Sequence, residues 1–293
     1  MLLISETPLK ILEVVVQEKM IRSVLYLILL FGLLSACLPI GKESAVAEAT
    51  ETTQPQFTPL PPFTQESINP GNMQAYSFLS SSGQEMDYLL YLPDNYYERP
   101  AWPLMLSLHG DKSTRISVDD VLNKMNPLIA LEPDSEFPFI LVAPVSPTAI
   151  WKFYYQPMDE LMDTLAESLS IDSDAIILTG FSKGAYGGWH YALSNPDQFA
   201  AFAPVAGGPG GGPVPENICL LKDLPIWIIH SEADFVIPIK ESYAALEALE
   251  QCGSSSIHMT TYTDLDHVDS IYAAYADPAL YEWLLQQTKS NKP

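Results

Sequence analysis

Basic residues are scarce in this sequence. Its 293 residues include 14 lysines and arginines against 36 aspartates and glutamates, which gives a formal net charge of −22 at pH 7. Residues 1–37 carry as many acidic as basic side chains, so the whole net charge lies after Cys37. A surface of this charge repels phosphate groups, which makes nucleic acid and anionic lipid headgroups poor partners. The simplest role for the acidity is solubility.

Histidine and cysteine are also few, with five and three residues respectively, and both are scattered along the chain. No group of them has the spacing of a metal site, and no phosphate-binding loop is present. The glycine-rich segment 207–212 is interpreted as a flexible loop near the site. No unit of about 20–50 residues repeats, which argues against solenoids and propellers. We therefore expect no metal and no cofactor.

A nearly uninterrupted apolar run spans residues 24–34, which is too short to cross a membrane comfortably. Arg22 precedes the run and two small residues precede Cys37, which is the order of regions in a secretory signal peptide. Residues 34–37 (LSAC) resemble the lipobox of bacterial lipoproteins. In that family the cysteine sulfur is acylated with diacylglycerol, and cleavage makes this cysteine the new N-terminus.

We therefore expect residues 1–37 to be a lipoprotein signal peptide, with the protein held by Cys37 on the extracytoplasmic side of a bacterial cell membrane. The alternatives are an ordinary signal peptide and an uncleaved N-terminal anchor. Glu13 and Glu18 do not suit a signal peptide, so residues 1–19 are best explained by a start codon assigned too early. Residues 38–72, rich in Thr, Pro, Gln, Ala and Glu, are predicted to be a disordered linker.

From residue 73 to residue 289, predicted strands alternate with predicted helices. The expected strands are residues 75–79, 88–92, 104–108, 139–143, 175–178, 199–205, 226–229 and 259–262. The expected helices are residues 158–168, 182–194, 239–251, 268–275 and 279–287. The first two strands are expected to pair as a hairpin. Continuously apolar strands are typical of a sheet covered on both faces, and the alternation with helices indicates parallel crossovers. The predicted fold class is α/β, a single domain with a mostly parallel, doubly wound sheet, whose ligands bind beyond the carboxyl ends of the strands.

The strand at 175–178 runs into the motif Gly-x-Ser-x-Gly at residues 180–184, and a helix rich in small residues follows. A nucleophilic serine at such a turn needs glycine two residues to either side, because larger side chains would collide. Ser182 is therefore the candidate nucleophile, and the backbone N–H of Lys183 is a candidate oxyanion donor at the start of the helix. The alternative is a structural serine in a turn, since the bare motif also arises by chance.

An acid and a histidine follow later strands in the order that a serine triad on this architecture requires. Asp234 follows the strand at 226–229, and His267 follows the strand at 259–262. His267 is expected to take the Ser182 proton, and Asp234 to orient the imidazole. Glu232 and Asp266 are rival acids, but the first comes too early in its turn and the second adjoins the histidine too closely. The other histidines are interpreted as structural: His109, His190, His230 and His258.

The turn after the strand at 104–108 is expected to supply the second oxyanion donor, the amide of Asp111. Its carboxylate would oppose a developing oxyanion unless it points to solvent or pairs with Lys112 or Lys183.

Several segments recur in the same order in a known group of enzymes. They are residues 91–94 (YLPD), 106–110 (LSLHG), 137–144 (FPFILVAP), 180–184 (GFSKG), 234–238 (DFVIP), 266–267 (DH) and 276–281 (ADPALY). They resemble the α/β-hydrolases described as predicted peptidases, feruloyl-esterase-like or polyhydroxybutyrate-depolymerase-like serine esterases. Asp111-Lys112 departs from the Gly or Ala-Gly usual there, and Lys183 departs from a frequent Met. The resemblance implies an α/β-hydrolase fold and acyl transfer on Ser182, Asp234 and His267.

The expected function is a lipid-anchored serine hydrolase that cleaves small-molecule carboxylic esters through an acyl-enzyme. Peptidase or acyl-peptidase activity on the same triad is one alternative, and a non-catalytic surface binding domain is another. Small or medium neutral esters are expected as substrates, because residues 206–225 leave little chain for a lipase lid and the net charge repels anions.

Cys219 and Cys252 form a possible disulfide. Each precedes one of the strands that lead to Asp234 and His267, and the expected compartment is oxidising.

Overall fold

The computed structural model describes residues 61–132, 135–210 and 212–292. Its centre is an eight-stranded sheet in the order β1-β2-β4-β3-β5-β6-β7-β8. The strands are β1 (Gln74–Leu79), β2 (Glu85–Tyr91), β3 (Trp102–Leu108), β4 (Ile140–Pro144), β5 (Ile171–Phe181), β6 (Ala201–Val205), β7 (Ile226–Ser231) and β8 (Ile257–Tyr262). The hairpin of β1 and β2 is antiparallel, as is the pairing of β2 with β4, and every other pairing is parallel. The predicted mostly parallel α/β sheet is confirmed.

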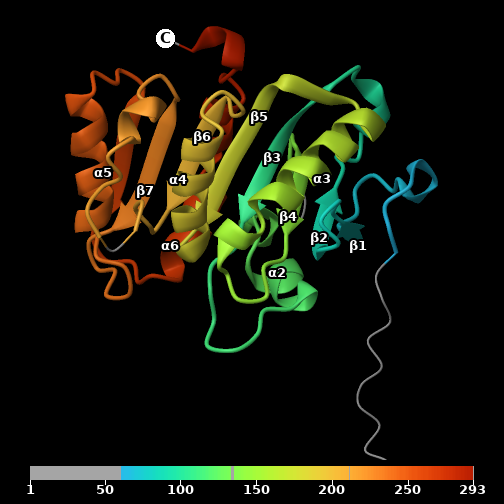
Figure 1. Cartoon of the computed structure of the whole chain (residues 1–293), viewed down its shortest axis with the longest axis horizontal. Coiled ribbons are helices and arrows are strands. Elements are labelled where there is room, and N and C mark those ends of the chain that lie inside the picture. The colour runs from blue at the N-terminus through green and yellow to red at the C-terminus, as the bar shows by residue number, and fades with distance from the viewer. Residues whose placement is uncertain (1–60, 133–134, 211, 293) are drawn as a thin grey trace, which may run out of the picture. The chain divides into compact units, whose positions relative to one another are not determined.

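Helices cover both faces of this sheet, and α3 and α4 cross in front of it in Figure 1. The helices are α2 (Val118–Lys124), α3 (Tyr155–Ser168), α4 (Lys183–Ser194), α5 (Lys240–Gln251), α6 (Asp269–Ala276) and α7 (Pro278–Leu284). Side chains of α3, α4 and α5 share one buried cluster, which includes Met158, Trp189 and Leu249. Side chains of α6 and α7 belong to a second cluster on the other face, which includes Ile271 and Leu280.

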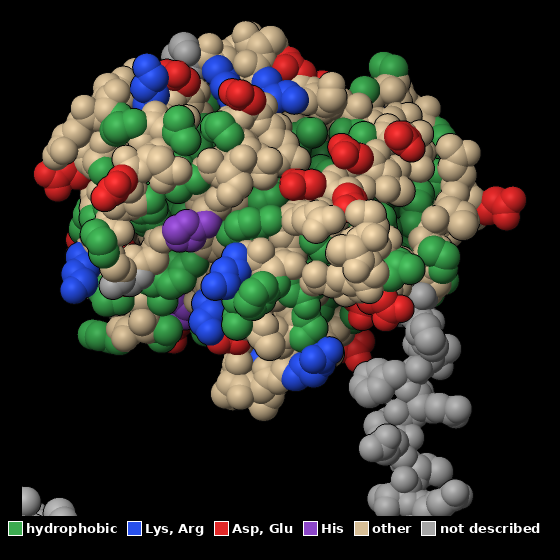
Figure 2. Space-filling view, in the orientation of Figure 1, with side chains coloured by type: hydrophobic (Ala, Val, Ile, Leu, Met, Phe, Trp, Pro, Cys, Tyr) green, Lys and Arg blue, Asp and Glu red, His purple; other side chains and the backbone are tan. Residues whose placement is uncertain are grey.

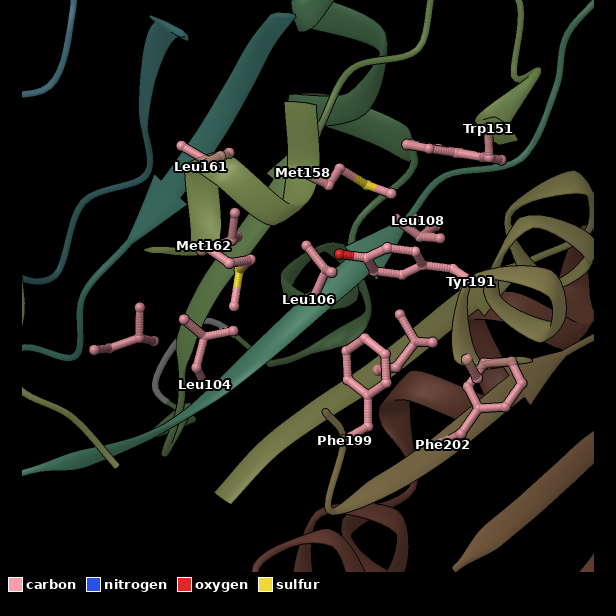
Figure 3. Close-up of a cluster of buried hydrophobic side chains, with 14 of the residues drawn as sticks. Leu104, Leu106, Leu108, Trp151, Met158, Leu161, Met162, Tyr191, Phe199 and Phe202 are labelled. Carbon is pink, nitrogen blue, oxygen red and sulfur yellow. The ribbon is translucent and has the colours of Figure 1, made fainter. Parts of the chain in front are cut away.

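Strand β3 shows how one sequence serves both faces. Leu104, Leu106 and Leu108 belong to the cluster under α3 and α4, whereas Met105 belongs to the cluster under α6. This follows from the two-residue period of a strand. Figure 3 shows these leucines facing the side chains of α3, among them Met158. All four β3 residues are at most 1% exposed, and burying each stabilises the fold by roughly 1.5–3 kcal/mol.

The structure adds one helix that the apolar pattern did not predict, moves one end of two others by three residues, and shifts the remaining predicted helix ends by at most one residue. Helix α2 buries only Val121, so it has no apolar stripe; its start is fixed instead by a capping box between Ser117 and Asp120. Helix α3 begins at Tyr155 rather than at residue 158, because Pro157 is compatible with the first turn of a helix. Helix α7 ends at Leu284, three residues before the predicted end.

The folded domain begins before residue 73, which corrects the predicted end of the linker. Phe63 packs edge-on against Tyr76 with 5.4 Å between ring centroids, and Ser77 donates a backbone hydrogen bond to the Pro61 carbonyl. Gly71, at φ +78°, donates its N–H to the carbonyl oxygen of Leu92, the residue that follows β2. At the other end, Ser290 donates to Asp174 beyond the predicted limit of residue 289. The predictions for residues 1–37 and for the linker up to residue 60 lie outside the described residues.

In the orientation of Figure 1, acidic and basic side chains are scattered among apolar ones rather than gathered in one patch (Figure 2). Of the helices in the described part of the chain, none has the length and apolar character needed to cross a bilayer.

A disulfide joins Cys219 and Cys252, whose Cα atoms are 5.4 Å apart. Cys219 lies in the 3-10 helix η5 (Ile218–Leu221), which precedes β7, and Cys252 caps the end of α5, which precedes β8. The bond therefore ties together the segments that enter two neighbouring strands.

We predict that the variant Cys219→Ser/Cys252→Ser is less stable than the native protein by about 3–4 kcal/mol, because the bond closes a loop of 33 residues and restricts the unfolded chain. Urea unfolding of both proteins measures the difference. Native protein treated with reductant should unfold at the same urea concentration as the variant. Equal stability of the oxidised native protein and the variant would contradict the prediction.

Candidate active site

The register of the parallel strands brings three loops to one edge of the sheet. Phe181 of β5 pairs with Val205 of β6, Val205 pairs with Ile229 of β7, and Ile229 pairs with Thr260 of β8. Parallel strands in register end at a common edge, where ligands bind in folds of this class. The residues that follow β5, β7 and β8 therefore meet there, and they include the predicted nucleophile, acid and base.

Ser182 lies in a strained turn between β5 and α4. Its backbone has φ 56° and ψ −120°, a conformation that residues other than glycine rarely adopt. Gly180 and Gly184 are required because a side chain at either position would collide with neighbouring backbone atoms. A Cβ atom at residue 180 would come within 2.4 Å of the Gly184 carbonyl oxygen, and one at residue 184 would come within 1.8 Å of the Leu108 carbonyl oxygen. The spacing of the Gly-x-Ser-x-Gly motif therefore has the steric cause that the sequence predicted.

The turn is also fixed to its neighbours by the backbone. Ser182 donates its N–H to the Val205 carbonyl at 2.9 Å, which extends the pairing of β5 with β6 beyond the strand. Lys183 is the first residue of α4, so its N–H has no acceptor within the helix. That amide is available to an anionic oxygen at the positive end of the helix.

The side chains of Ser182, His267 and Asp234 form a continuous hydrogen-bonded chain. The Ser182 Oγ lies 2.8 Å from His267 Nε2, and His267 Nδ1 lies 2.6 Å from Asp234 Oδ2. With Asp234 accepting at Nδ1, the imidazole keeps its proton there and leaves Nε2 to accept the serine hydroxyl proton. Phe181 packs against the His267 ring with 4.9 Å between centroids, which restricts rotation of the ring.

Four donors surround the buried Asp234 carboxylate. Its Oδ1 accepts the backbone N–H groups of Val236 and Ile237, each at 2.9 Å. Its Oδ2 accepts from His267 and lies 3.1 Å from His230 Nε2. Burial, with an exposed fraction of 5%, demands such partners for a carboxylate. The acid is thus held in one orientation toward the base.

His230 is a residue whose contact with the acid the sequence analysis missed. Its Nε2 faces two acceptors, Asp234 Oδ2 and the Ile237 carbonyl oxygen at 3.0 Å, so that nitrogen carries a proton. Its Nδ1 lies 2.7 Å from the Ser242 hydroxyl, which donates to it. Burial lowers the pKa of His230 and keeps the ring neutral at pH 7. The only signal in the sequence is its position at the end of β7, four residues before Asp234.

The two rival acids have other positions. Asp266 Oδ1 accepts the N–H groups of Val268 and Asp269, each at 2.8 Å, in the turn that leads into α6. Glu232 is exposed, and its backbone N–H donates to the Tyr262 carbonyl. Neither carboxylate is hydrogen-bonded to His267 in the described structure, which agrees with the choice of Asp234.

The turn after β3 lies against the nucleophile. A Cβ atom at residue 110 would come within 3.2 Å of the Ser182 Cβ and 2.8 Å of the Phe181 ring, so only glycine allows this approach. The His109 side chain restrains this turn through two hydrogen bonds. Its Nδ1 donates to the Gly110 carbonyl at 2.7 Å, and its Nε2 accepts the Ser146 N–H at 2.9 Å. The Asp111 amide follows directly, where the sequence predicted the second oxyanion donor.

The Asp111 carboxylate is paired rather than free. Its Oδ2 lies 2.5 Å from Lys183 Nζ, and its Oδ1 accepts the backbone N–H of Lys112 at 2.8 Å. The Lys112 ammonium is bonded to Asp120 in the capping box of α2. Of the arrangements considered from the sequence, the structure shows the pairing of Asp111 with Lys183.

The glycine-rich segment after β6 is buried where it begins, which corrects its interpretation as a flexible loop. A Cβ atom at residue 207 would come within 2.8 Å of both the Ala185 side chain and the Ser182 carbonyl oxygen. The Gly207 carbonyl also accepts the indole N–H of Trp189 at 3.2 Å. Across the described ranges, no cluster of three or more His, Cys, Asp or Glu side chains forms a metal site.

Comparison with known proteins supports the fold. The Phospholipase/Carboxylesterase family matches residues 149–272, a span that contains Ser182, Asp234 and His267. A solved structure of a thermostable esterase superposes with a TM-score of 0.61 and 25% identity, covering 74% of this chain and 63% of the esterase. The chain has the α/β-hydrolase fold.

Two curated proteins are similar to this α/β-hydrolase. The bifunctional acetylxylan esterase/xylanase XynS20E of Neocallimastix patriciarum is 25% identical over 210 residues, which are 69% of this chain and 28% of that protein. The probable feruloyl esterase C of Aspergillus terreus is 32% identical over 130 residues, which are 42% of this chain and 46% of that protein. This chain therefore spans less than half the length of either curated relative.

His109 makes the stability of this α/β-hydrolase dependent on pH. Burial lowers the pKa of His109 to about 4, whereas the same group titrates near 6.5 in the unfolded chain. Between these two values the unfolded state binds the proton and the folded state does not, so the free energy of unfolding falls as the pH falls. The contribution of this one residue is on the order of 3 kcal/mol.

We predict that His109→Gln reduces the loss of stability between pH 6.5 and pH 4, because glutamine cannot titrate but its amide oxygen can still accept the Ser146 N–H. Urea unfolding at several pH values across this window measures the slope for each protein. Parallel slopes for the variant and the native protein would contradict the assignment of this pH dependence to His109.

Proposed function

We propose that this protein is a serine hydrolase that cleaves carboxylic esters through an acyl-enzyme on Ser182. The observation that carries the proposal is the hydrogen-bonded chain from Ser182 through His267 to Asp234, with distances of 2.8 Å and 2.6 Å. The Ser182 hydroxyl lies at the common edge of the parallel strands, where a substrate reaches it from solvent.

In the proposed reaction the Ser182 Oγ attacks the ester carbonyl while His267 Nε2 accepts the hydroxyl proton. The resulting imidazolium is stabilised by Asp234, whose position is fixed by its other donors. His267 then returns the proton to the leaving alcohol, and the acyl group stays on Ser182. Water activated by the same imidazole releases the carboxylic acid in the second half of the reaction.

The negative oxygen of each tetrahedral intermediate needs two donors. The amide of Lys183 points out of the first turn of α4, and the amide of Asp111 follows Gly110, which packs on Ser182. Two backbone N–H groups held in rigid turns stabilise the negative charge as it develops, because they need not reorganise. Losing one such donor typically lowers the rate by about 10²- to 10³-fold.

Two observations favour ester hydrolysis over the alternatives. The two curated relatives and the thermostable esterase described above are named esterases, so an ester is the first substrate to test. A non-catalytic binding domain has no use for the backbone strain at Ser182, which costs on the order of 1–3 kcal/mol. Peptide bond cleavage by the same triad remains a second candidate, to be separated by assay.

Small or medium neutral esters remain the proposed substrates. Between Val205 and Ile226, the described residues form only the short helix η5, and the disulfide at Cys219 ties it to α5. This connection is unlike a mobile hydrophobic lid. The net charge of −22 still disfavours anionic substrates, but the Asp111 carboxylate adds little to that effect because Lys183 neutralises it.

We predict that Ser182→Ala lowers kcat for aryl ester hydrolysis by about 10⁴-fold or more, because Oγ is the attacking atom. Hydrolysis of acetyl, butyryl and palmitoyl aryl esters and labelling with a fluorophosphonate are the measurements. Ser194→Ala, a change on the same helix, is the control and should keep both activity and labelling. Full activity of Ser182→Ala, with the label attached elsewhere, would overturn the assignment.

The anchoring of this hydrolase by a lipid on Cys37, on the extracytoplasmic side of a bacterial membrane, is also part of the proposal; the lipobox-like residues 34–37 support it. We predict that Cys37→Ser moves the protein out of the membrane fraction or leaves it unprocessed. Mass spectrometry of the native N-terminus should find a diacylglycerol-modified Cys37. An unmodified N-terminus that starts at another residue would argue against the anchor.

A further inference from the structure

We propose that Lys183 is a positioning residue for the oxyanion hole: its ammonium group holds and neutralises the Asp111 carboxylate, which otherwise opposes the negative charge of the transition state. This inference rests on the proposed function. It assigns a role to the side chain of a residue of which only the backbone N–H is used in the proposed mechanism.

The geometry joins the two segments that supply the oxyanion donors. Lys183 and Asp111 each carry one of the two proposed amide donors, and their side chains meet at 2.5 Å between Nζ and Oδ2. Asp111 is adjacent to Gly110, which packs on the Ser182 side chain. Lys183 is adjacent to Ser182 in the sequence. The carboxylate is therefore bound by the residue that follows the nucleophile, and it belongs to the residue that follows Gly110.

Lys183 is the cation on which Asp111 depends. The neighbouring Lys112 directs its ammonium to Asp120, which is also bonded by the Ser117 hydroxyl and N–H. Lys112 reaches Asp111 only through its backbone N–H. Removal of the Lys183 ammonium thus leaves Asp111 without an ionic partner in the described structure.

The ion pair of Lys183 and Asp111 contributes little to the stability of the fold, but we expect it to have a large effect on the rate of the reaction. Its side chains are 45% and 33% exposed, and exposed ion pairs contribute little to stability. An unpaired charge on a residue that carries an oxyanion donor acts mainly on the transition state, because the negative charge of the oxyanion develops only there. The two partners are therefore not equivalent. Loss of the lysine leaves an opposing charge, whereas loss of the aspartate charge leaves a favourable one.

This asymmetry gives the test its form. The variants are Lys183→Met, Lys183→Arg, Asp111→Asn and the double variant Lys183→Met/Asp111→Asn. Lys222→Met is the control, because it removes an equally exposed lysine from an ion pair with Asp223 on the segment before β7. Each protein is measured for kcat and KM on an aryl acetate at low salt, and for inhibition by an aryl trifluoromethyl ketone, whose adduct carries an oxyanion.

We predict that Lys183→Met lowers kcat by about 10- to 100-fold with KM changed less than about threefold, and weakens the ketone in proportion. Lys222→Met, which lies outside the site, should keep the native kcat. Lys183→Arg keeps the cation and should lose less kcat than Lys183→Met, and Asp111→Asn removes the opposing charge and should not reproduce the loss seen in Lys183→Met. The decisive result is the double variant, in which Asp111→Asn should restore the rate lost in Lys183→Met to within about threefold of native.

A double variant as slow as Lys183→Met would overturn the inference, and so would a Lys183→Met protein with native kcat. Labelling by a fluorophosphonate separates these failures from failure of the proposed function. If native protein is not labelled at Ser182, the proposed function itself is wrong. If it is labelled and the variants behave otherwise than stated, only the role of Lys183 is wrong.

Discussion

The turn at Ser182 is the constraint on which the rest of the site depends. Its positive φ raises the hydroxyl above the sheet, and the turn fits only because Gly180 and Gly184 leave no side chain between β5, α4 and the end of β3. Gly110, in the loop after β3, likewise leaves no side chain against Phe181 and Ser182. Strand order, helix position and the oxyanion turn are therefore linked through close contacts at these three glycines, which tolerate almost no added volume.

The charged and titratable groups around this turn are arranged so that few opposing charges remain near the reaction. Asp234 is buried but has donors on both oxygens, one of them from a histidine that burial keeps neutral. His109 is neutral for the same reason and acts as a hydrogen-bonding support for the oxyanion turn. Asp111, which follows Gly110, is paired with Lys183. On the face that Figure 2 shows, the acidic side chains are scattered rather than gathered in one patch.

Strands β7 and β8 are joined at both ends by side chains. At the amino ends, the disulfide of Cys219 and Cys252 connects the segments that enter the strands. At the carboxyl ends, Asp234 and His267 meet at 2.6 Å. Strand β8 is the edge of the sheet and is only half-buried, so packing alone restrains it less than the central strands. The disulfide limits the ways in which this edge can separate from β7, and so supports the strand that carries the base.

The sequence by itself determined the alternation of strands and helices, the motif around Ser182, and the order of acid and base, because these depend on local periodicity and on residues that follow strand ends. It did not predict helix α2, whose start depends on a capping box rather than on an apolar stripe, or the packing of Phe63 on the domain. Only the tertiary structure decided which partner Asp111 takes and that His230 contacts Asp234. These contacts join residues on different elements or across a loop, and their side-chain directions are set by the register of the sheet and the packing of the loops, which no local pattern of residues records.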